Sequence, residues 1–563
     1  MSYFWMGDGT HKVPFSMHRR HREEVARKIR EEHPAVKGTR TFLLMKGGGE
    51  QSLYDTDTTW DFRQEANFQY LFGAKEPGLW GGIDIDSGKG YLFIPKLDEI
   101  YATWLGPIRT KEHFKNYYEV EDVLYLDSEE LKAFMHKHTR GIVTPIGTNL
   151  DSGSRSFNEH SKATFMKENS LSPLTTASEH FSSIVWTVLN ESRAVKDADE
   201  IRILEFACKV SAQAHIAVMK KVYQTHTNEV LCAPSTSPTH RPWPAMQMVK
   251  SKEYLSEAEF KYQSFLRGCA RVGYTCICPS GENNAVLHYG HAAEPNMEDV
   301  QSGEMKLHDM GAEYHCYTSD ITVSFPVTGK FTDAQRRIYS AVWSAVQAVE
   351  RRLRPGVRYG DMHKLAQRTL LHSLKGFVFL ETADVEEMMK YDLAGFFMPH
   401  GLGHMLGLAV HDVGGYVPGE SRKNYPDIKQ NLRLNRELKE NMVLTVEPGF
   451  YFIPHCIRQV FQDEGKKKFM KMSEATLLQQ MTKEVGGVRI EDNVQITKTG
   501  CRVLHTTPRE IEEIEGVMQG KFEWDFEVEC LREYNGAAGG GSPMANGGDH
   551  GGTPSKKQKT SSA

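Results

Sequence analysis

Residues 307–326 read LHDMGAEYHCYTSDITVSFP, two strand-like runs that flank a turn-prone centre. This pattern predicts an antiparallel β-hairpin. A hairpin centred between Tyr314 and His315 places Asp309 directly opposite Asp320, on the same face of the ladder. Two like charges in that position destabilise a sheet unless a cation lies between them. The apolar neighbours of Asp320 disfavour the alternative of two solvated surface aspartates. The segment therefore predicts a hairpin that carries two metal ligands.

Three more potential ligands follow in strand-like or turn-like contexts. His404 ends MPHGLGH, Glu447 follows the apolar run MVLTV, and Glu491 lies in GGVRIEDN. A carboxylate at the end of a buried strand needs a partner, and a metal ion supplies one. Arg489 shares the face of Glu491 and is expected to orient it. Four carboxylates and one imidazole, without a thiolate, favour two divalent ions of the manganese or cobalt type over structural zinc.

Further histidines surround these ligands in the sequence. His288 and His291 lie in VLHYGH, and His411 precedes an aspartate in AVHDVGG. A dinuclear hydrolase needs groups that hydrogen-bond the substrate carbonyl and the tetrahedral intermediate, and imidazole can do both. We therefore expect His288 and His411 to contact substrate, whereas the residue pattern leaves His291 equally compatible with a structural role.

The composition excludes several classes of protein. The chain has 563 residues, 39 % of them hydrophobic and 25 % charged, and a net charge of −5. This charge gives no general case for binding nucleic acid or an anionic membrane. The N-terminus does not resemble a secretory signal, and no apolar stretch is long enough to span a bilayer. Nine scattered cysteines indicate free thiols. In YTCICPSG we expect Cys276 and Cys278 on a buried strand, the alternative being a metal or redox site. We expect a soluble, cytoplasmic protein.

The length and the pattern of elements predict an α+β protein with two domains and two additions. An α/β domain is expected over residues 1–180, with a helix at 17–31. A catalytic domain is expected over 190–520, with long helices from Asp197, from a capping box at Thr332 and from Asp361. The proline-rich segment 225–252 is an insertion, either a surface loop or partly disordered. The glycine-rich tail 535–563 is expected to be disordered; Lys556, Lys557 and Lys559 in it favour a solvated tail over a nuclear-import signal.

Long motifs in this chain resemble the pita-bread metallopeptidases, which include methionine aminopeptidase, aminopeptidase P and creatinase, and they are most similar to the prolidase (Xaa-Pro dipeptidase) family. The order Asp309, Asp320, His404, Glu447 and Glu491 matches the metal set of these enzymes. The likeness extends over residues 1–520 and is carried by FRQEANFQYLFG, YATWLGPI, KEHFK, YTCICPSGENNAVLHYGHA, SDITVSFP, FMPHGLGHMLGLAVHDVGGY, MVLTVEPGFYF and GGVRIEDN. His308 and Asn441 depart from the family pattern, and neither departure removes a ligand.

The resemblance implies an N-terminal α/β domain followed by a pita-bread catalytic domain, and a homodimer. It implies two Mn²⁺ ions per subunit, with Co²⁺ or Zn²⁺ as other options, bridged by Asp320 and Glu491. Arg433 matches the arginine that receives the carboxylate of the dipeptide, and a guanidinium suits that role. Trp104 resembles a residue that reaches the active site of the partner subunit.

The implied reaction is hydrolysis of Xaa-Pro dipeptides by a hydroxide held between the two metals. His288 or His411 would stabilise the oxyanion, and Glu447 would carry a proton to the leaving nitrogen. One alternative is a Xaa-Pro aminopeptidase that acts on longer peptides, although a carboxylate clamp at Arg433 would obstruct them. Another alternative is a non-catalytic binding protein of the same fold, which the retention of all five ligands disfavours.

Overall fold

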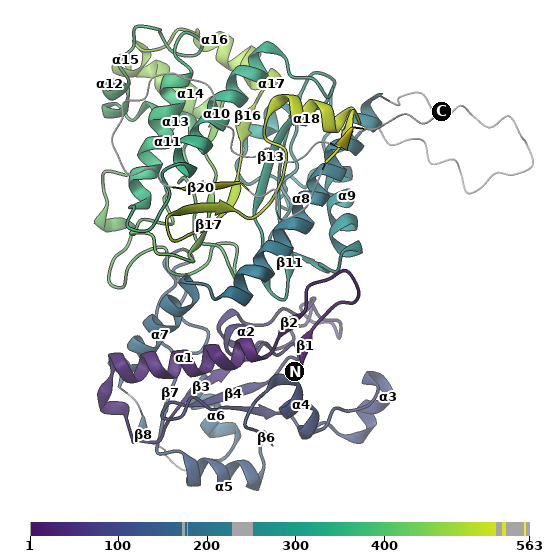
Figure 1. The fold of residues 1–563 in the computed structure, drawn as a ribbon, viewed down its shortest axis with the longest axis vertical. Helices are drawn as coiled ribbons and strands as arrows, with labels where there is room; N and C mark the ends of the chain where they lie inside the picture. Colours follow the sequence, from purple (N-terminus) through teal and green to yellow (C-terminus); the bar gives the residue numbers. More distant parts are fainter. Residues whose placement is uncertain are drawn as a thin grey trace, which may run out of the picture. The chain divides into compact units, whose positions relative to one another are not determined.

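The computed structural model describes residues 2–171, 175–176, 178–227, 251–428, 431–524, 532–535 and 557–558. Its contacts divide the chain into two compact units (Figure 1). Unit 1 comprises residues 1–203 and 412–414, and unit 2 comprises residues 204–411 and 415–563. Most of the predicted insertion (228–250) and of the glycine-rich tail lies outside the described residues. Within the tail, Lys557–Gln558 forms the short strand β21, which pairs with β19 (Phe522–Glu523).

Unit 1 is built on a six-stranded mixed sheet in the order β6-β5-β4-β3-β7-β8. The buried residues of its central strands, such as Phe42, Leu44, Trp80 and Phe93, form one hydrophobic core with the helices. The strands are β3 (Thr41–Lys46), β4 (Trp80–Asp84), β5 (Gly90–Ile94), β6 (Asp122–Tyr125), β7 (Gly141–Val143) and β8 (Thr175–Thr176). The helices include α1 (Ser16–Glu32), α2 (Ala66–Phe72), α3 (Ala102–Leu105), α4 (Lys111–Tyr118), α5 (Glu129–His138), α6 (Ser161–Glu168) and α7 (Glu179–Ala194).

Unit 2 combines the predicted long helices with antiparallel strands. The helix α8 (Ala198–Thr227) crosses the boundary between the units. Thr332 and Gln335 form the predicted capping box at the start of α10 (Asp333–Glu350). Further helices are α9 (Glu253–Leu266), α11 (Tyr359–Ser373), α12 (Val385–Lys390), α13 (Leu393–Phe397), α14 (Pro454–Gln462) and α18 (Ile511–Met518).

The strands of unit 2 carry the predicted ligands at their ends. They pair as β10 (Met305–Met310) with β13 (Ile321–Pro326), β15 (Gly449–Tyr451) with β16 (Gly487–Arg489), and β11 (Ala312–Tyr314) with both β12 (Tyr317–Thr318) and β9 (Arg271–Val272). The four-stranded sheet has the order β14 (Val443–Val446), β17 (Asp492–Ile496), β18 (Gly500–Val503) and β20 (Glu533–Asn535). Every strand pair described in this unit is antiparallel.

The predicted register of the ligand hairpin is wrong by two residues. Asp309 pairs with Thr322, not with Asp320, because the turn is centred on His315 and Cys316. Both residues have positive φ, 49° and 66°, as a two-residue turn of the I′ type requires. A shift of two residues keeps each side chain on its original face. The two aspartates are therefore diagonal neighbours, still on one side of the ladder.

The cysteine predictions can be compared with seven described cysteines. All seven are free, and Cys276 and Cys278 are buried. Their segment pairs with β10 only through isolated bridges at Ile277 and Ser280. The predicted continuous strand is therefore wrong, although the segment is extended. Among the described helices, none has the length and hydropathy needed to cross a membrane.

Candidate metal centre

A cavity of about 480 Å³ in unit 2 collects the residues that the sequence singles out. Its lining includes all five predicted ligands and Arg489, Arg433, His288, His291 and His411. This volume lies within the range of small-molecule sites. Trp104 is not in this lining; it lies on α3 of unit 1, and 79 % of its surface is exposed.

The predicted ligands reach the cavity from the ends of different strands. Asp309 lies on β10, Asp320 directly precedes β13, and Glu491 lies between β16 and β17. Glu447 follows β14, where Pro448 ends the strand. His404 is placed by backbone bonds, because its N–H donates to Thr445 Oγ1 over 3.1 Å and its carbonyl accepts from Thr445 N.

Three ligand atoms converge tightly. One oxygen each of Asp320 and Glu491 and a ring nitrogen of His404 lie within 4.8 Å of one another. His404 Nε2 lies 3.3 Å from Asp320 Oδ2 and 3.4 Å from Glu447 Oε1. His404 Nδ1 donates to the Met405 carbonyl over 3.0 Å, which leaves Nε2 directed at the carboxylates. This is the orientation in which a histidine binds a metal ion.

Burial and mutual repulsion raise the pKa values of three of these carboxylates. Burial and the neighbouring carboxylate of Asp309 raise the pKa of Asp320. Burial raises the pKa of Glu447 to about 7, opposed by His404. Burial and the carboxylates of Asp320, Glu447 and Asp309 hold the pKa of Glu491 well above its usual range. Like charges that share a buried site favour protonation unless a metal neutralises them.

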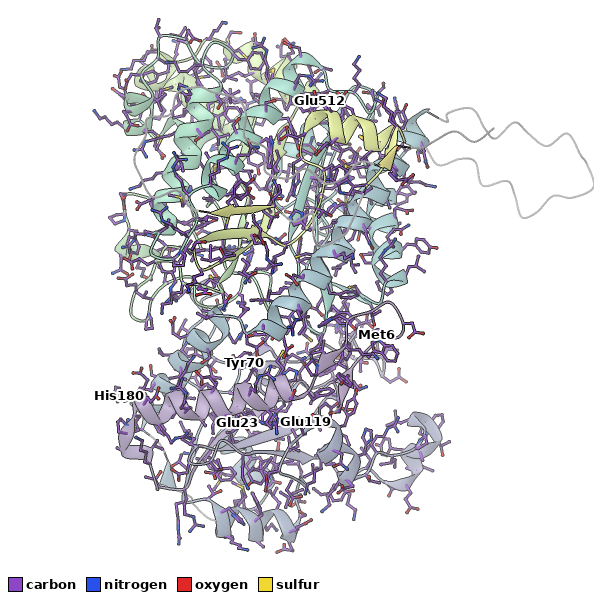
Figure 2. The ribbon with its side chains drawn as sticks, viewed as in Figure 1. Met6, Glu23, Tyr70, Glu119, His180 and Glu512 are labelled. Carbon is purple, nitrogen blue, oxygen red and sulfur yellow. The ribbon has the colours of Figure 1, made fainter. Side chains whose placement is uncertain are left out.

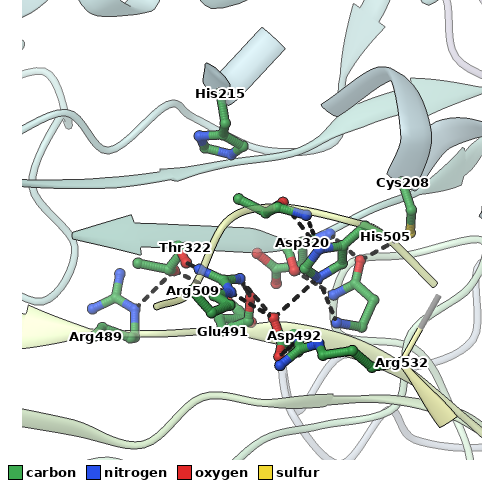
Figure 3. Close-up of polar contacts among 12 residues, drawn as sticks. Cys208, His215, Asp320, Thr322, Arg489, Glu491, Asp492, His505, Arg509 and Arg532 are labelled. Carbon is green, nitrogen blue, oxygen red and sulfur yellow. Dashed lines mark hydrogen bonds and ion pairs between the residues drawn. The ribbon is translucent and has the colours of Figure 1, made fainter. Parts of the chain in front are cut away.

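Asp309 differs because Arg489 neutralises it. Arg489 Nη2 lies 2.5 Å from Asp309 Oδ2, and Arg489 is itself buried. Although burial alone would raise the pKa of Asp309, this guanidinium lowers it. Arg489 also donates to Thr322 Oγ1, and the Thr322 hydroxyl donates to Glu491 Oε2 over 2.7 Å (Figure 3). Arg489 therefore contacts Asp309 directly and reaches Glu491 through Thr322.

Sequence reasoning missed Tyr274. Its buried hydroxyl lies 2.7 Å from Asp309 Oδ1 and 2.5 Å from Asp320 Oδ1. Burial and these two carboxylates hold the pKa of Tyr274 well above its usual range, so it is the hydrogen-bond donor. No spacing rule links residue 274 to the aspartates, because their contact depends on how the 274–280 segment lies along β10.

Three neutral histidines line the cavity beside the ligands. Burial and the positive charge of His404 lower the pKa of His411 to about 2, and the two rings meet edge to face at 4.5 Å. Burial and Arg489 lower the pKa of His288. His400, which the sequence did not single out, is held between Gly401 O and the Tyr451 hydroxyl. Burial lowers its pKa to about 3. Neutral imidazoles can donate one hydrogen bond and accept another, as carbonyl recognition requires.

Comparison with known proteins gives consistent results. Residues 202–498 match metallopeptidase family M24, and residues 18–143 match the aminopeptidase P N-terminal domain. The Xaa-Pro dipeptidase of Homo sapiens is 40 % identical over 518 residues, 92 % of this chain and 96 % of that protein. A probable Xaa-Pro aminopeptidase of Sordaria macrospora is 31 % identical over 89 % of this chain and 96 % of that protein.

Solved structures show the same fold. Aminopeptidase P from E. coli with the inhibitor Pro-Leu superposes with a TM-score of 0.66 and 26 % identity, covering 90 % of this chain and 99 % of that chain. The zinc-substituted E. coli enzyme in complex with product gives a TM-score of 0.66 and 25 % identity over 90 % and 99 % of the two chains. These matches confirm the predicted N-terminal domain and pita-bread fold.

Proposed function

Because this chain belongs to metallopeptidase family M24, we propose that it hydrolyses Xaa-Pro dipeptides at a centre of two divalent metal ions. The observation that carries this proposal is one cavity that holds five metal-type ligands together with Arg433. The similar Xaa-Pro dipeptidases support the substrate class, because the similarity extends over nearly the whole of their length.

The donor set fits the metals. Four carboxylates and one imidazole suit hard divalent ions, of which manganese is our first choice, with cobalt or zinc as other options. The buried oxygen Glu491 Oε1 has no hydrogen-bond partner among the described residues. Burial and neighbouring carboxylates raise the pKa values of Asp320 and Glu491, and divalent cations would offset that repulsion. Asp309, Asp320, His404, Glu447 and Glu491 would hold the ions, with Asp320 and Glu491 shared between them.

When bound, the ions would supply an activated water at neutral pH and would polarise the scissile carbonyl. The chain's own residues would bind and orient the dipeptide. Arg433 would pair with its terminal carboxylate. His288 and His411 would hydrogen-bond the scissile carbonyl and the developing oxyanion. Glu447, at the rim of the ligand cluster, would carry the proton to the leaving imino nitrogen.

In a dimer, Trp104 of one copy would reach the metal-centre cavity of the other copy and complete its substrate site. Ile100, Tyr101, Trp104 and Leu105 are all substantially exposed on one short segment of unit 1. We propose a homodimer in which this segment contacts the partner. Mutation of Trp104 to alanine should raise KM for the dipeptide, as measured with the dimeric fraction from gel filtration. Free thiols in the described region support a cytoplasmic location.

The aminopeptidase alternative makes a different prediction for Arg433. Hydrolysis of Gly-Pro and of a Gly-Pro-Yaa tripeptide should be compared in Mn²⁺ and in excess chelator. We expect rapid, chelator-sensitive cleavage of the dipeptide. Arg433→Ala removes a charge-assisted bond of about 1.5–3 kcal/mol, so kcat/KM for Gly-Pro should fall roughly 10- to 150-fold, with little change for the tripeptide. Cleavage of the tripeptide alone would refute the dipeptidase proposal, and activity that survives chelation would refute the metal centre.

A further inference from the structure

A second cluster of metal-type ligands lies in unit 1, outside the cavity. It consists of His21 on α1 and of Asp197 and Glu200 at the start of α8. One ligand atom from each residue lies within 4.8 Å of the other two. His21 is 4 % exposed and Glu200 is 1 % exposed, whereas the side chain of Asp197 is 30 % exposed. The proposed peptidase chemistry uses none of the three.

The ring of His21 is oriented as a ligand. His21 Nδ1 lies 2.9 Å from the Tyr70 carbonyl, which can only accept, so Nδ1 carries a proton and donates it. The ring also stacks on Tyr70, with ring centroids 4.0 Å apart. Figure 2 labels Tyr70 beside helix α1. His21 Nε2 is buried and makes no hydrogen bond of good geometry within the described residues. It faces Asp197 Oδ2 at 3.3 Å and Glu200 Oε2 at 3.6 Å.

The two carboxylates are fixed by backbone groups. Asp197 Oδ1 accepts the N–H groups of Asp199 and Glu200, each over 2.9 Å. Glu200 Oε2 accepts the N–H of Asp197 over 2.8 Å. These reciprocal bonds hold both side chains before any ligand arrives. Arg20 lies on the outer side of Asp197, with Nη2 3.1 Å from Oδ2. A carboxylate oxygen has two lone pairs, so this contact leaves one directed at His21.

The spacing is that of a tetrahedral zinc site. Zinc binds nitrogen and carboxylate oxygen at about 2.0–2.2 Å, so its ligands lie about 3.4 Å from one another. The two measured separations from His21 Nε2, 3.3 and 3.6 Å, bracket that value. We propose that His21, Asp197 and Glu200 bind one zinc ion, with a water molecule as the fourth ligand on the exposed side of Asp197. The ion would link α1 to the start of α8.

The competing occupant is a proton. Burial lowers the pKa of His21. The neighbouring carboxylates of Glu200 and Asp197 raise it, and the net shift is upward. A protonated His21 would form an ion pair with both carboxylates. Zinc needs the deprotonated nitrogen, and its binding would therefore release that proton to solvent. The two occupants give opposite results in a metal analysis.

The test is the zinc content of the full-length protein. Wild type and His21→Asn should be stripped with chelator, equilibrated with Zn²⁺, freed of unbound metal and analysed by atomic emission. We expect the variant to hold one zinc per chain fewer, at unchanged Gly-Pro hydrolysis. The difference between the two proteins isolates this site whatever the catalytic centre binds. Zn²⁺ should also raise the thermal midpoint less in the variant than in wild type.

His18→Asn is the matched control. His18 lies on the same buried face of α1, and its Nδ1 bonds the same Tyr70 carbonyl over 3.0 Å. It should keep the wild-type zinc content. If His21→Asn is insoluble, Glu200→Gln serves instead, since its amide oxygen can still accept the Asp197 N–H. A zinc content equal to wild type in either soluble variant would refute the site and identify the cluster as a protonated ion pair.

Discussion

The ion pair between Arg489 and Asp309 should stabilise the metal-free protein strongly. Both side chains are buried, with 2.5 Å between Arg489 Nη2 and Asp309 Oδ2. Removal of one partner of a buried pair costs about 3–5 kcal/mol, because the other charge stays buried without compensation. Arg489→Met should therefore lower the unfolding free energy by about that amount, and it also removes the bond to the Tyr451 hydroxyl. Arg489→Met combined with Asp309→Asn removes both charges of the pair and should cost less than the sum of the single substitutions.

The assay is a double-mutant cycle in excess chelator, so that metal binding does not contribute. Urea unfolding of wild type, both single variants and the double variant should be followed by fluorescence and by circular dichroism. We expect a coupling of about 2 kcal/mol or more between the two positions. Additivity within about 0.5 kcal/mol would refute the reasoning, since it would show that the two charges do not interact in the native protein.

Three further outcomes follow from the structure. Tyr274→Phe removes the hydroxyl that bridges two predicted ligands, and titration calorimetry should show manganese affinity about 10- to 100-fold weaker. Arg532 pairs with two buried acids, Asp492 and Glu350, so Arg532→Gln should lower the free energy of unfolding in urea by about 3–5 kcal/mol. Arg502 on β18 is equally exposed and pairs with the less buried Glu205, so Arg502→Gln should cost less. Burial lowers the pKa of His215 to about 3, so the unfolded chain binds a proton that the native protein does not. As the pH falls from 6.5 to about 3, this residue should therefore lower the free energy of unfolding by about 1.4 kcal/mol per pH unit. His215→Gln should remove this contribution in urea titrations.

Asp492 and Glu350 are buried acids whose neutralisation by Arg532 is not visible in local sequence patterns. Asp492 follows Glu491, and both Arg509 and Arg532 pair with it (Figure 3). Glu350 lies 3.8 Å from the same Arg532. Arg532 directly precedes strand β20 and lies beyond the residues that match the M24 family. Local sequence cannot predict this contact, because it joins segments that are distant along the chain.

Local sequence signals were enough to predict the main helices and strands and the chemical class of the site. Amphipathic spacing, the capping box at Thr332 and the carboxylates at strand ends are local signals, and each reports what a residue needs from its immediate surroundings. The hairpin showed the limit of such signals. Its parity was predictable because side chains alternate with a period of two, but its register depended on left-handed backbone at His315 and Cys316.

The pairing of buried charges could be read only from the folded structure. It placed Arg489 on Asp309, brought Tyr274 to both aspartates and set His21 against two carboxylates. The physical reason is that the energy of a buried charge depends on every group within a few ångströms. Those groups come from strands and helices that the sequence separates and the fold brings together.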